Sequence, residues 1–151
     1  MLPKYHITIG AIITTIIFSI FPITPLQATI IFLSSFLIDV DHYLIYAFKT
    51  KDYSLKNSRK FFHKRREDWL KLSIRNQKNY KRYIYFFHGI EFWLILIFLT
   101  KYIYLMKFIL IGIAIHMILD YIDFLYYKQP LYAKFSQFYV YFTNKKKMDF
   151  L

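Results

Sequence analysis

The sequence contains no cysteine, only three glycines and only nine acidic residues among 151. The absence of cysteine excludes disulfides and thiolate metal sites, so any metal ion must be held by imidazole nitrogen and carboxylate oxygen. The nine acids stand against 21 Lys and Arg, which gives a net charge of +12. Such a charge raises the question of nucleic-acid binding. However, the chain carries no recognised nucleic-acid-binding module, so we expect no specific nucleic-acid partner.

Hydrophobic residues are abundant, at 57% of the chain, and 23% of all residues are aromatic. A helix needs roughly 20 apolar residues to cross the hydrocarbon core of a membrane. The stretch 7–21 is apolar on every face rather than on one stripe, which argues against the alternative of a soluble all-α bundle. We therefore predict an all-α fold, a single integral membrane domain over 1–151 with about four transmembrane helices. The expected spans are about 5–23, 26–48, 83–100 and 103–127.

The basic residues are concentrated in one segment, because 49–82 holds 13 of the 21 Lys and Arg and only three acids. A loop of this kind faces the cytoplasm. With four spans, both termini, including the C-terminal tail 128–151, would then be cytoplasmic in a multi-pass protein of the cell (inner) membrane. Within the loop, 59–74 is expected to form a helix that lies at the membrane surface. Membrane lipid is therefore the expected partner, with anionic headgroups at the loop 49–82.

Five of the nine acids and four of the five histidines lie within the apolar stretches. A carboxylate in such a segment is costly and persists when it is paired, hydrated or bound to a metal. Mixed His and Asp/Glu at helical spacing is also how helix bundles bind metal. We therefore predict a site for one or two divalent metal ions, with zinc favoured and manganese, iron or magnesium as alternatives. The expected ligands are His6, Asp39, Asp41, His42, His88, Glu91, His116 and Asp120.

The Asp-Val-Asp-His run at 39–42 sets a condition on the geometry of the second span. At 100° per residue, Asp39 and His42 share a face, whereas Asp41 points about 200° away from Asp39. Both aspartates can reach one centre only if the helix ends or unwinds near Val40. Otherwise, Asp41 supports another ligand or faces the headgroups.

The remaining polar residues have other expected roles. His88 and Glu91 point to one face of a helix, and Glu91 or Asp41 would be left as the general base beside a metal. Asp123 is close to the cytoplasmic end of the fourth span, where we expect it either to support the ligands or to be simply hydrated. His63, in the basic loop, is expected to be an ordinary interfacial residue.

Four motifs together resemble those of the YdjM-like membrane-bound metal-dependent hydrolase family, with a fainter likeness to zinc-dependent phospholipase C. They are His6 in the first span, D-x-D-H at 39–42, His88 early in the third span and H-x-x-x-D at 116–120. The chain departs from the family in having Ile38 where a proline is usual, and in lacking the family's H-R-x-x-T-H-S run. The resemblance implies a hydrolase whose metal is bound by these residues.

The leading hypothesis is a metal-dependent hydrolase that acts on a lipid or phosphate-ester substrate at the cytoplasmic leaflet. A transporter of metal ions or protons is an alternative, but it needs polar groups through both leaflets, and the outer halves of the predicted spans are almost wholly apolar. A non-catalytic membrane adaptor stabilised by a metal is a third possibility. The sequence leaves the oligomeric state undetermined.

Overall fold

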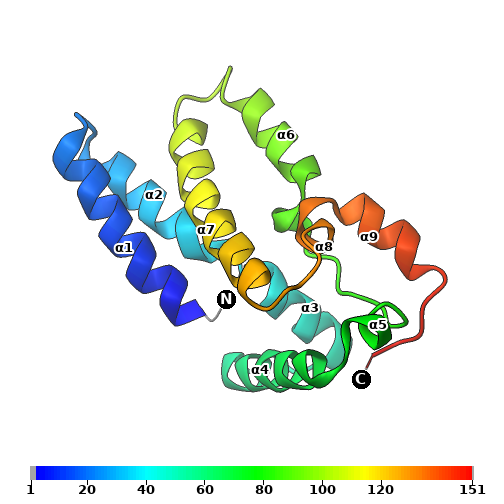
Figure 1. The fold of residues 1–151 in the computed structure, drawn as a ribbon. Coiled ribbons are helices and arrows are strands. Elements are labelled where there is room, and N and C mark those ends of the chain that lie inside the picture. Colours follow the sequence, from blue (N-terminus) through cyan, green and yellow to red (C-terminus); the bar gives the residue numbers. More distant parts are fainter. Residues whose placement is uncertain (1–2, 151) are drawn as a thin grey trace.

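The computed structural model describes residues 3–150, which are mostly helical (Figure 1). No strand occurs in this range, although an isolated bridge pairs Tyr80 with Met148. The prediction of an all-α fold is therefore confirmed for the described residues. The helices are α1 (Pro3–Ile20), α2 (Pro25–Leu37), α3 (Val40–Thr50), α4 (Leu55–Lys71), α5 (Ile74–Gln77), the 3-10 helix η1 (Phe86–His88), α6 (Ile90–Leu99), α7 (Met106–Tyr126), α8 (Tyr132–Phe135) and α9 (Gln137–Asn144).

Three helical segments are long and apolar enough to cross a membrane, which indicates a membrane protein. They are Pro3–Ile20, Pro25–Thr50 and Met106–Tyr126. The predicted span 83–100 differs, because its helix α6 begins only at Ile90 and has ten residues. Gly89, immediately before it, is extended (φ −87°, ψ 154°), so the chain turns sharply between η1 and α6.

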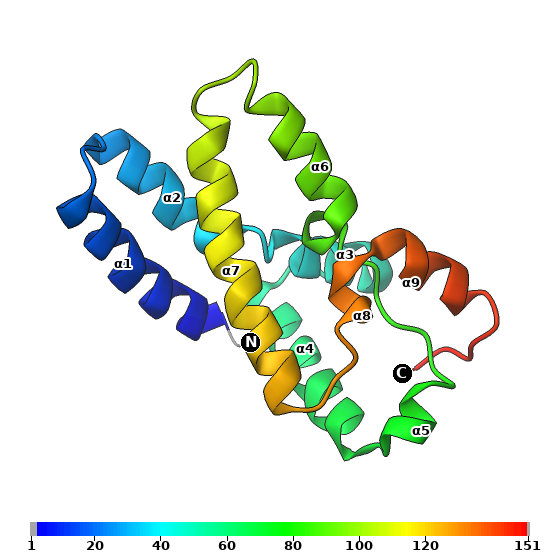
Figure 2. The ribbon, with the colours of Figure 1, turned by 45° about the horizontal axis from the view of Figure 1, so that its top comes forward.

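Helices α1 and α2 form an antiparallel hairpin, and α7 packs beside α2 (Figures 1 and 2). Two glycines allow the close approach. A Cβ at Gly10 would overlap the Ser35 hydroxyl, and one at Gly112 would overlap the Ile31 carbonyl and the Ser34 hydroxyl. Small residues at such crossings let helix backbones approach in a membrane. This approach brings the first turns of α1 and the second half of α7 to the same level.

The second apolar segment is interrupted between α2 and α3. Helix α2 ends at Leu37 and α3 begins at Val40, with Asp39 between them. The ψ of Asp39 is −1°, whereas an α-helical residue has about −42°. The break near Val40 that the sequence makes a condition for two converging aspartates is thus present.

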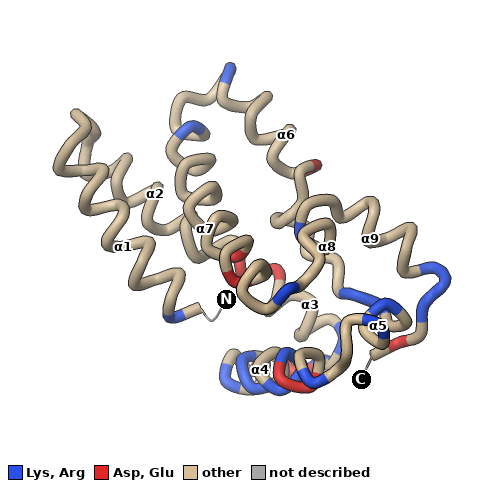
Figure 3. Tube along the Cα trace, in the orientation of Figure 1, with Lys and Arg blue, Asp and Glu red and all other residues tan. Residues whose placement is uncertain are grey.

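The basic loop and the C-terminal segment are both folded. Helix α4 packs against α3, and α9 packs against α6, so that residues 128–150 cover the bundle instead of extending from it as a tail. Figure 3 shows the Lys and Arg positions gathered on α4, α5 and the chain around the C-terminus, at the end of the bundle opposite the α1–α2 loop. The basic loop with α4 and the C-terminal segment with α9 therefore form this polar end together, although they are distant in the sequence.

Candidate metal centre

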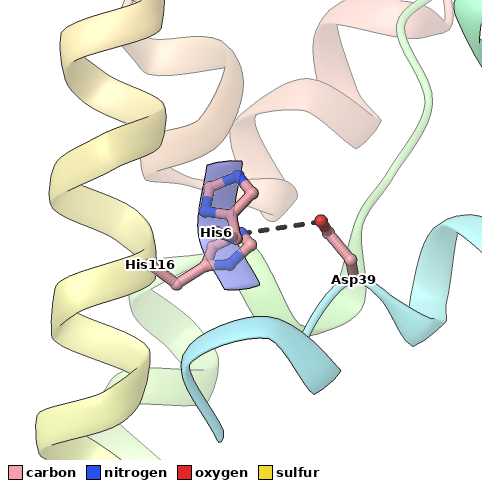
Figure 4. Close-up of side chains that lie close together, drawn as sticks. All are labelled: His6, Asp39 and His116. Carbon is pink, nitrogen blue, oxygen red and sulfur yellow. Dashed lines mark ion pairs between the residues drawn. The ribbon is translucent and has the colours of Figure 1, made fainter. Parts of the chain in front are cut away.

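Four buried side chains meet where α1, α7 and η1 approach the break between α2 and α3. His6, His88, His116 and Asp120 are each 0% exposed, and Asp39 lies beside them. The rings of His6 and His116 are stacked, with centroids 3.9 Å apart. Figure 4 shows both rings with the Asp39 carboxylate directed at the His116 ring. The structure thus brings together five predicted ligands from four separate elements.

The spacing of their donor atoms fits a metal ion. His88 Nε2 lies 3.5 Å from Asp39 Oδ1 and 3.7 Å from Asp120 Oδ2. His116 Nε2 lies 3.5 Å and 3.3 Å from the same two oxygens. A tetrahedral ion with ligands at about 2.0–2.1 Å separates them by roughly 3.3 Å. Each of these four His–Asp separations is therefore close to that value, and His88, His116 and Asp120 form one group whose donor atoms all lie within 4.8 Å of one another.

The carboxylates of this set can also serve a second ion. His6 Nε2 lies 3.4 Å from Asp120 Oδ1, the oxygen not used in the spacings above. His6 also forms a group with Asp39 and His116 whose donor atoms lie within 4.8 Å of one another, and Asp39 forms another such group with His42 and His88. Buried His and Asp groups that could hold a metal ion are therefore present, and the donor set can accommodate one or two ions.

The histidine nitrogens facing the centre have no hydrogen-bond partner within the described residues. His88 Nε2, His116 Nε2 and both ring nitrogens of His6 are buried and unpartnered. The opposite nitrogens are engaged, because His116 Nδ1 donates to the Ser35 carbonyl at 3.0 Å and His88 Nδ1 donates to Asp41 Oδ2 at 2.9 Å. A proton on Nδ1 leaves the lone pair of Nε2 directed at the centre, as in metal-bound histidines. Without a metal, these buried nitrogens would carry a desolvation cost with no compensating bond.

Asp41 lies behind the histidines rather than among the ligands. It is 4% exposed and accepts hydrogen bonds from His42 Nδ1 (2.9 Å), His88 Nδ1 (2.9 Å) and the Phe87 amide (3.3 Å). Although the helix breaks near Val40, the chain beyond the break directs this carboxylate at Nδ1 atoms. Asp41 was considered as a metal ligand, a general base, a support for another ligand or a residue facing the headgroups. Its contacts with the two histidines fit the supporting role.

Glu91 lies outside the cluster. Its carboxylate accepts hydrogen bonds from Ser136 Oγ at 2.6 Å, the Gln137 amide at 3.1 Å and the Phe138 amide at 3.2 Å. It therefore caps the N-terminus of α9. The prediction that His88 and Glu91 share a helical face fails because the extended Gly89 separates η1 from α6, so that the two residues do not belong to one helix.

Two further candidates also have other partners. Asp123 accepts from Arg66 Nη2 at 2.8 and 2.9 Å, which ties α7 to α4. His63 lies 3.5 Å from Glu67 on the exposed side of α4, although it borders the cavity described below. Asp123 thus helps to hold α4 over the centre, as a supporting residue would.

One residue of the centre was not predicted from the sequence. Lys134 on α8 is 6% exposed, and its Nζ forms an ion pair with Asp120. Its ammonium also lies 5.8 Å from the centroid of the Tyr85 ring. The only sequence signal is a lysine between aromatic residues in 132–135, and that signal could not reveal the packing of α8 on α7.

A cavity of about 340 Å³ opens over the centre. Asp39 and His42 line it on the side of the metal ligands, and α4 and the segment 82–85 contribute aromatic and basic walls. The His42 ring stacks on Tyr85, with centroids 4.0 Å apart, so that both rings border the same space. Small-molecule sites commonly have volumes of about 300–1,000 Å³. The cavity can therefore admit a ligand of headgroup size next to the ligand cluster.

Comparisons with protein-family models, with curated proteins and with solved structures found no match to this chain.

Proposed function

We propose that this protein is a membrane-embedded, metal-dependent hydrolase that acts on a lipid or phosphate-ester substrate at the cytoplasmic leaflet. The observation that carries the proposal is the convergence of unpartnered, buried imidazole nitrogens with carboxylate oxygens at 3.3–3.7 Å, behind a cavity that Asp39 lines. Such a donor set favours zinc, with manganese, iron or magnesium as alternatives. The proposed ligands are His88, His116, Asp39 and Asp120 for a first ion, joined by His6 for a second.

A bound divalent ion would lower the pKa of a coordinated water toward neutrality and polarise a phosphoryl or acyl oxygen. The chain would supply proton transfer through His42. This ring borders the cavity with 25% of its side chain exposed, and Asp41 holds its Nδ1. A histidine oriented in this way by a carboxylate is suited to act as a general base. His42 is an alternative metal ligand through its group with Asp39 and His88.

The membrane arrangement is part of the proposal. Helix α6 would be the fourth membrane element, although its ten residues cover only about 15 Å of a core of roughly 30 Å. The α1–α2 and α6–α7 loops would face outward, and the basic end with α4 would lie at the cytoplasmic interface. Most Lys and Arg positions in Figure 3 lie at the end of the bundle with α4 and α5, opposite the α1–α2 loop, which supports this orientation.

Membership of the YdjM-like family is proposed with it. The residues that carry the resemblance are His6, the run 39–42, His88, His116 and Asp120. All of them contribute to the cluster or to its immediate support. This agreement favours a shared metal centre over independent structural roles for each residue.

The test is the metal content of the purified protein in detergent, with a matched pair of histidine variants. We expect one or two divalent ions per chain in the wild type. His116→Gln, at a buried ligand, should lose most of the metal, whereas His63→Gln, at an exposed histidine, should retain it. Absence of metal from the wild type at any stoichiometry, or full metal content in His116→Gln, would contradict the proposal.

Activity is then measured on lipid and soluble phosphate esters with the metal-loaded protein. Turnover that disappears in His116→Gln and not in His63→Gln supports a hydrolase. Metal flux into proteoliposomes without turnover would instead favour the transporter. Bound metal with neither turnover nor flux would favour the adaptor.

A further inference from the structure

Arg82 lies in the segment between α5 and η1 and borders the cavity above the metal centre. Its guanidinium lies over the Trp69 ring, 4.6 Å from the centroid, and Nη2 donates to Gln129 Oε1 at 3.5 Å. Its Nε is buried and has no hydrogen-bond partner. None of the salt bridges between described residues involves Arg82. The Tyr132 side chain also hydrogen-bonds to Arg82. The guanidinium is thus oriented by neutral groups and forms no salt bridge with a carboxylate of the described residues.

The backbone at this position is also held. The Arg82 amide donates to Asn144 Oδ1 at 3.0 Å, and Asn144 Nδ2 donates to the Arg82 carbonyl at 2.8 Å. Burial lowers the pKa of Arg82, which reflects the cost of removing its charge from water. A buried charge without a partner is costly, whereas a bound anion would remove that cost. The position is therefore a preformed cationic site held by its backbone and by neutral side chains, with no partner for Nε among the described residues.

The other cations on the cavity wall are committed or exposed. Arg66 binds Asp123, Arg65 donates to the Phe150 carbonyl, and Lys134 pairs with Asp120. Arg59 is on the exposed side of α4. Five lining residues are Lys or Arg and two are Asp, so the cavity is electropositive beside the ligand cluster. Arg82 is the partly buried cation of this wall that has no carboxylate partner among the described residues.

We propose that Arg82 binds the phosphate group of an amphiphilic phosphate ester in this cavity. The planar fork of arginine matches two phosphate oxygens, and the aromatic wall formed by Phe62, Trp69 and Tyr127 would contact the apolar part of the molecule. This inference rests on the proposed hydrolase function, because the ester would be presented to the metal centre behind the cavity. A lipid headgroup and a soluble ester offer the same phosphate chemistry.

The test compares Arg82→Gln with Arg59→Gln, a matched change at the exposed arginine of the same cavity. Binding of phenyl phosphate to the purified protein is measured by calorimetry in a neutral detergent. Binding of vesicles of phosphatidylcholine, with and without phosphatidic acid, is measured in parallel with protein in nanodiscs. We expect Arg82→Gln to weaken phosphate binding about tenfold or more, and Arg59→Gln to change it less than about twofold. Arg82→Lys should recover part of the loss, because it restores the charge but not the fork.

The outcomes separate this inference from the proposed function. Metal content is measured on the same samples, and circular dichroism confirms that each variant is folded. Normal metal content with no phosphate binding, or equal effects of the two arginine variants, would overturn the role of Arg82 while leaving the metal centre intact. Phosphate binding that depends on Arg82 in a protein without metal would support the anion site and contradict the hydrolase. Preference for phosphatidic acid over phenyl phosphate would identify a lipid as the source of the phosphate.

Discussion

Replacement of Asp41 by Asn should weaken metal binding without touching a proposed ligand. The Asp41 carboxylate fixes the protons of two histidines on Nδ1, through contacts of 2.9 Å to His42 and 2.9 Å to His88. An amide of the same shape presents one oxygen and one NH₂ group, so it cannot accept from both rings. At least one ring must then move its proton to Nε2 or lose its hydrogen bond. A protonated Nε2 on His88 can no longer bind the ion.

Loss of such a supporting contact typically lowers metal affinity about 10- to 100-fold, or about 1.4–2.8 kcal/mol. The assay is competition between the purified protein and a chromophoric chelator, performed in the same detergent for wild type and variant. Asp149→Asn is the control, since Asp149 is 85% exposed and, among the described residues, pairs with Lys81 at the surface. An unchanged affinity in Asp41→Asn, with the variant folded, would refute the reasoning that this carboxylate orients the ligands.

Two further predictions concern stability. Glu91→Gln should leave the metal content unchanged but lower the free energy of unfolding by roughly 1–2 kcal/mol, because the charged cap of α9 is lost. Thermal unfolding and metal analysis test this prediction, and loss of metal in the variant would show that Glu91 is a metal ligand. Removal of the metal by a chelator should lower the thermal midpoint, since an ion at about 100 times its dissociation constant contributes about 2.7 kcal/mol. The stabilisation by the metal should be present above about pH 6.5 and disappear as the pH falls, because imidazoles must be unprotonated to bind metal. A thermal midpoint that does not change on addition of chelator at neutral pH would contradict this prediction.

Helix phase predicted the site well where the helices are continuous. His116 and Asp120 are four residues apart on α7, and their donors lie 3.3 Å apart. The same reasoning was wrong for His88 and Glu91, because it assumed a helix through Gly89. For Asp41 the prediction depended on a break in the helix near Val40, because the sequence does not give the direction of the helix that follows Asp39. Periodicity is informative only as long as the backbone keeps its period.

Sequence alone determined the class of the protein and the chemistry open to it. The apolar stretches predict membrane helices because they are long enough to cross a bilayer and apolar on every face, and the lack of cysteine leaves only histidine and carboxylate as metal ligands. The tertiary structure decided which candidates meet: it gathered His6, Asp39, His88, His116 and Asp120, and assigned Glu91 to the cap of α9. It also brought Lys134 to the centre and Arg82 to the wall of the cavity above it, from segments that show no membrane pattern. The physical reason is that the local sequence pattern indicates which residues are buried and whether the backbone is helical. Contacts between charged residues that are distant in sequence depend instead on how loops and short helices pack.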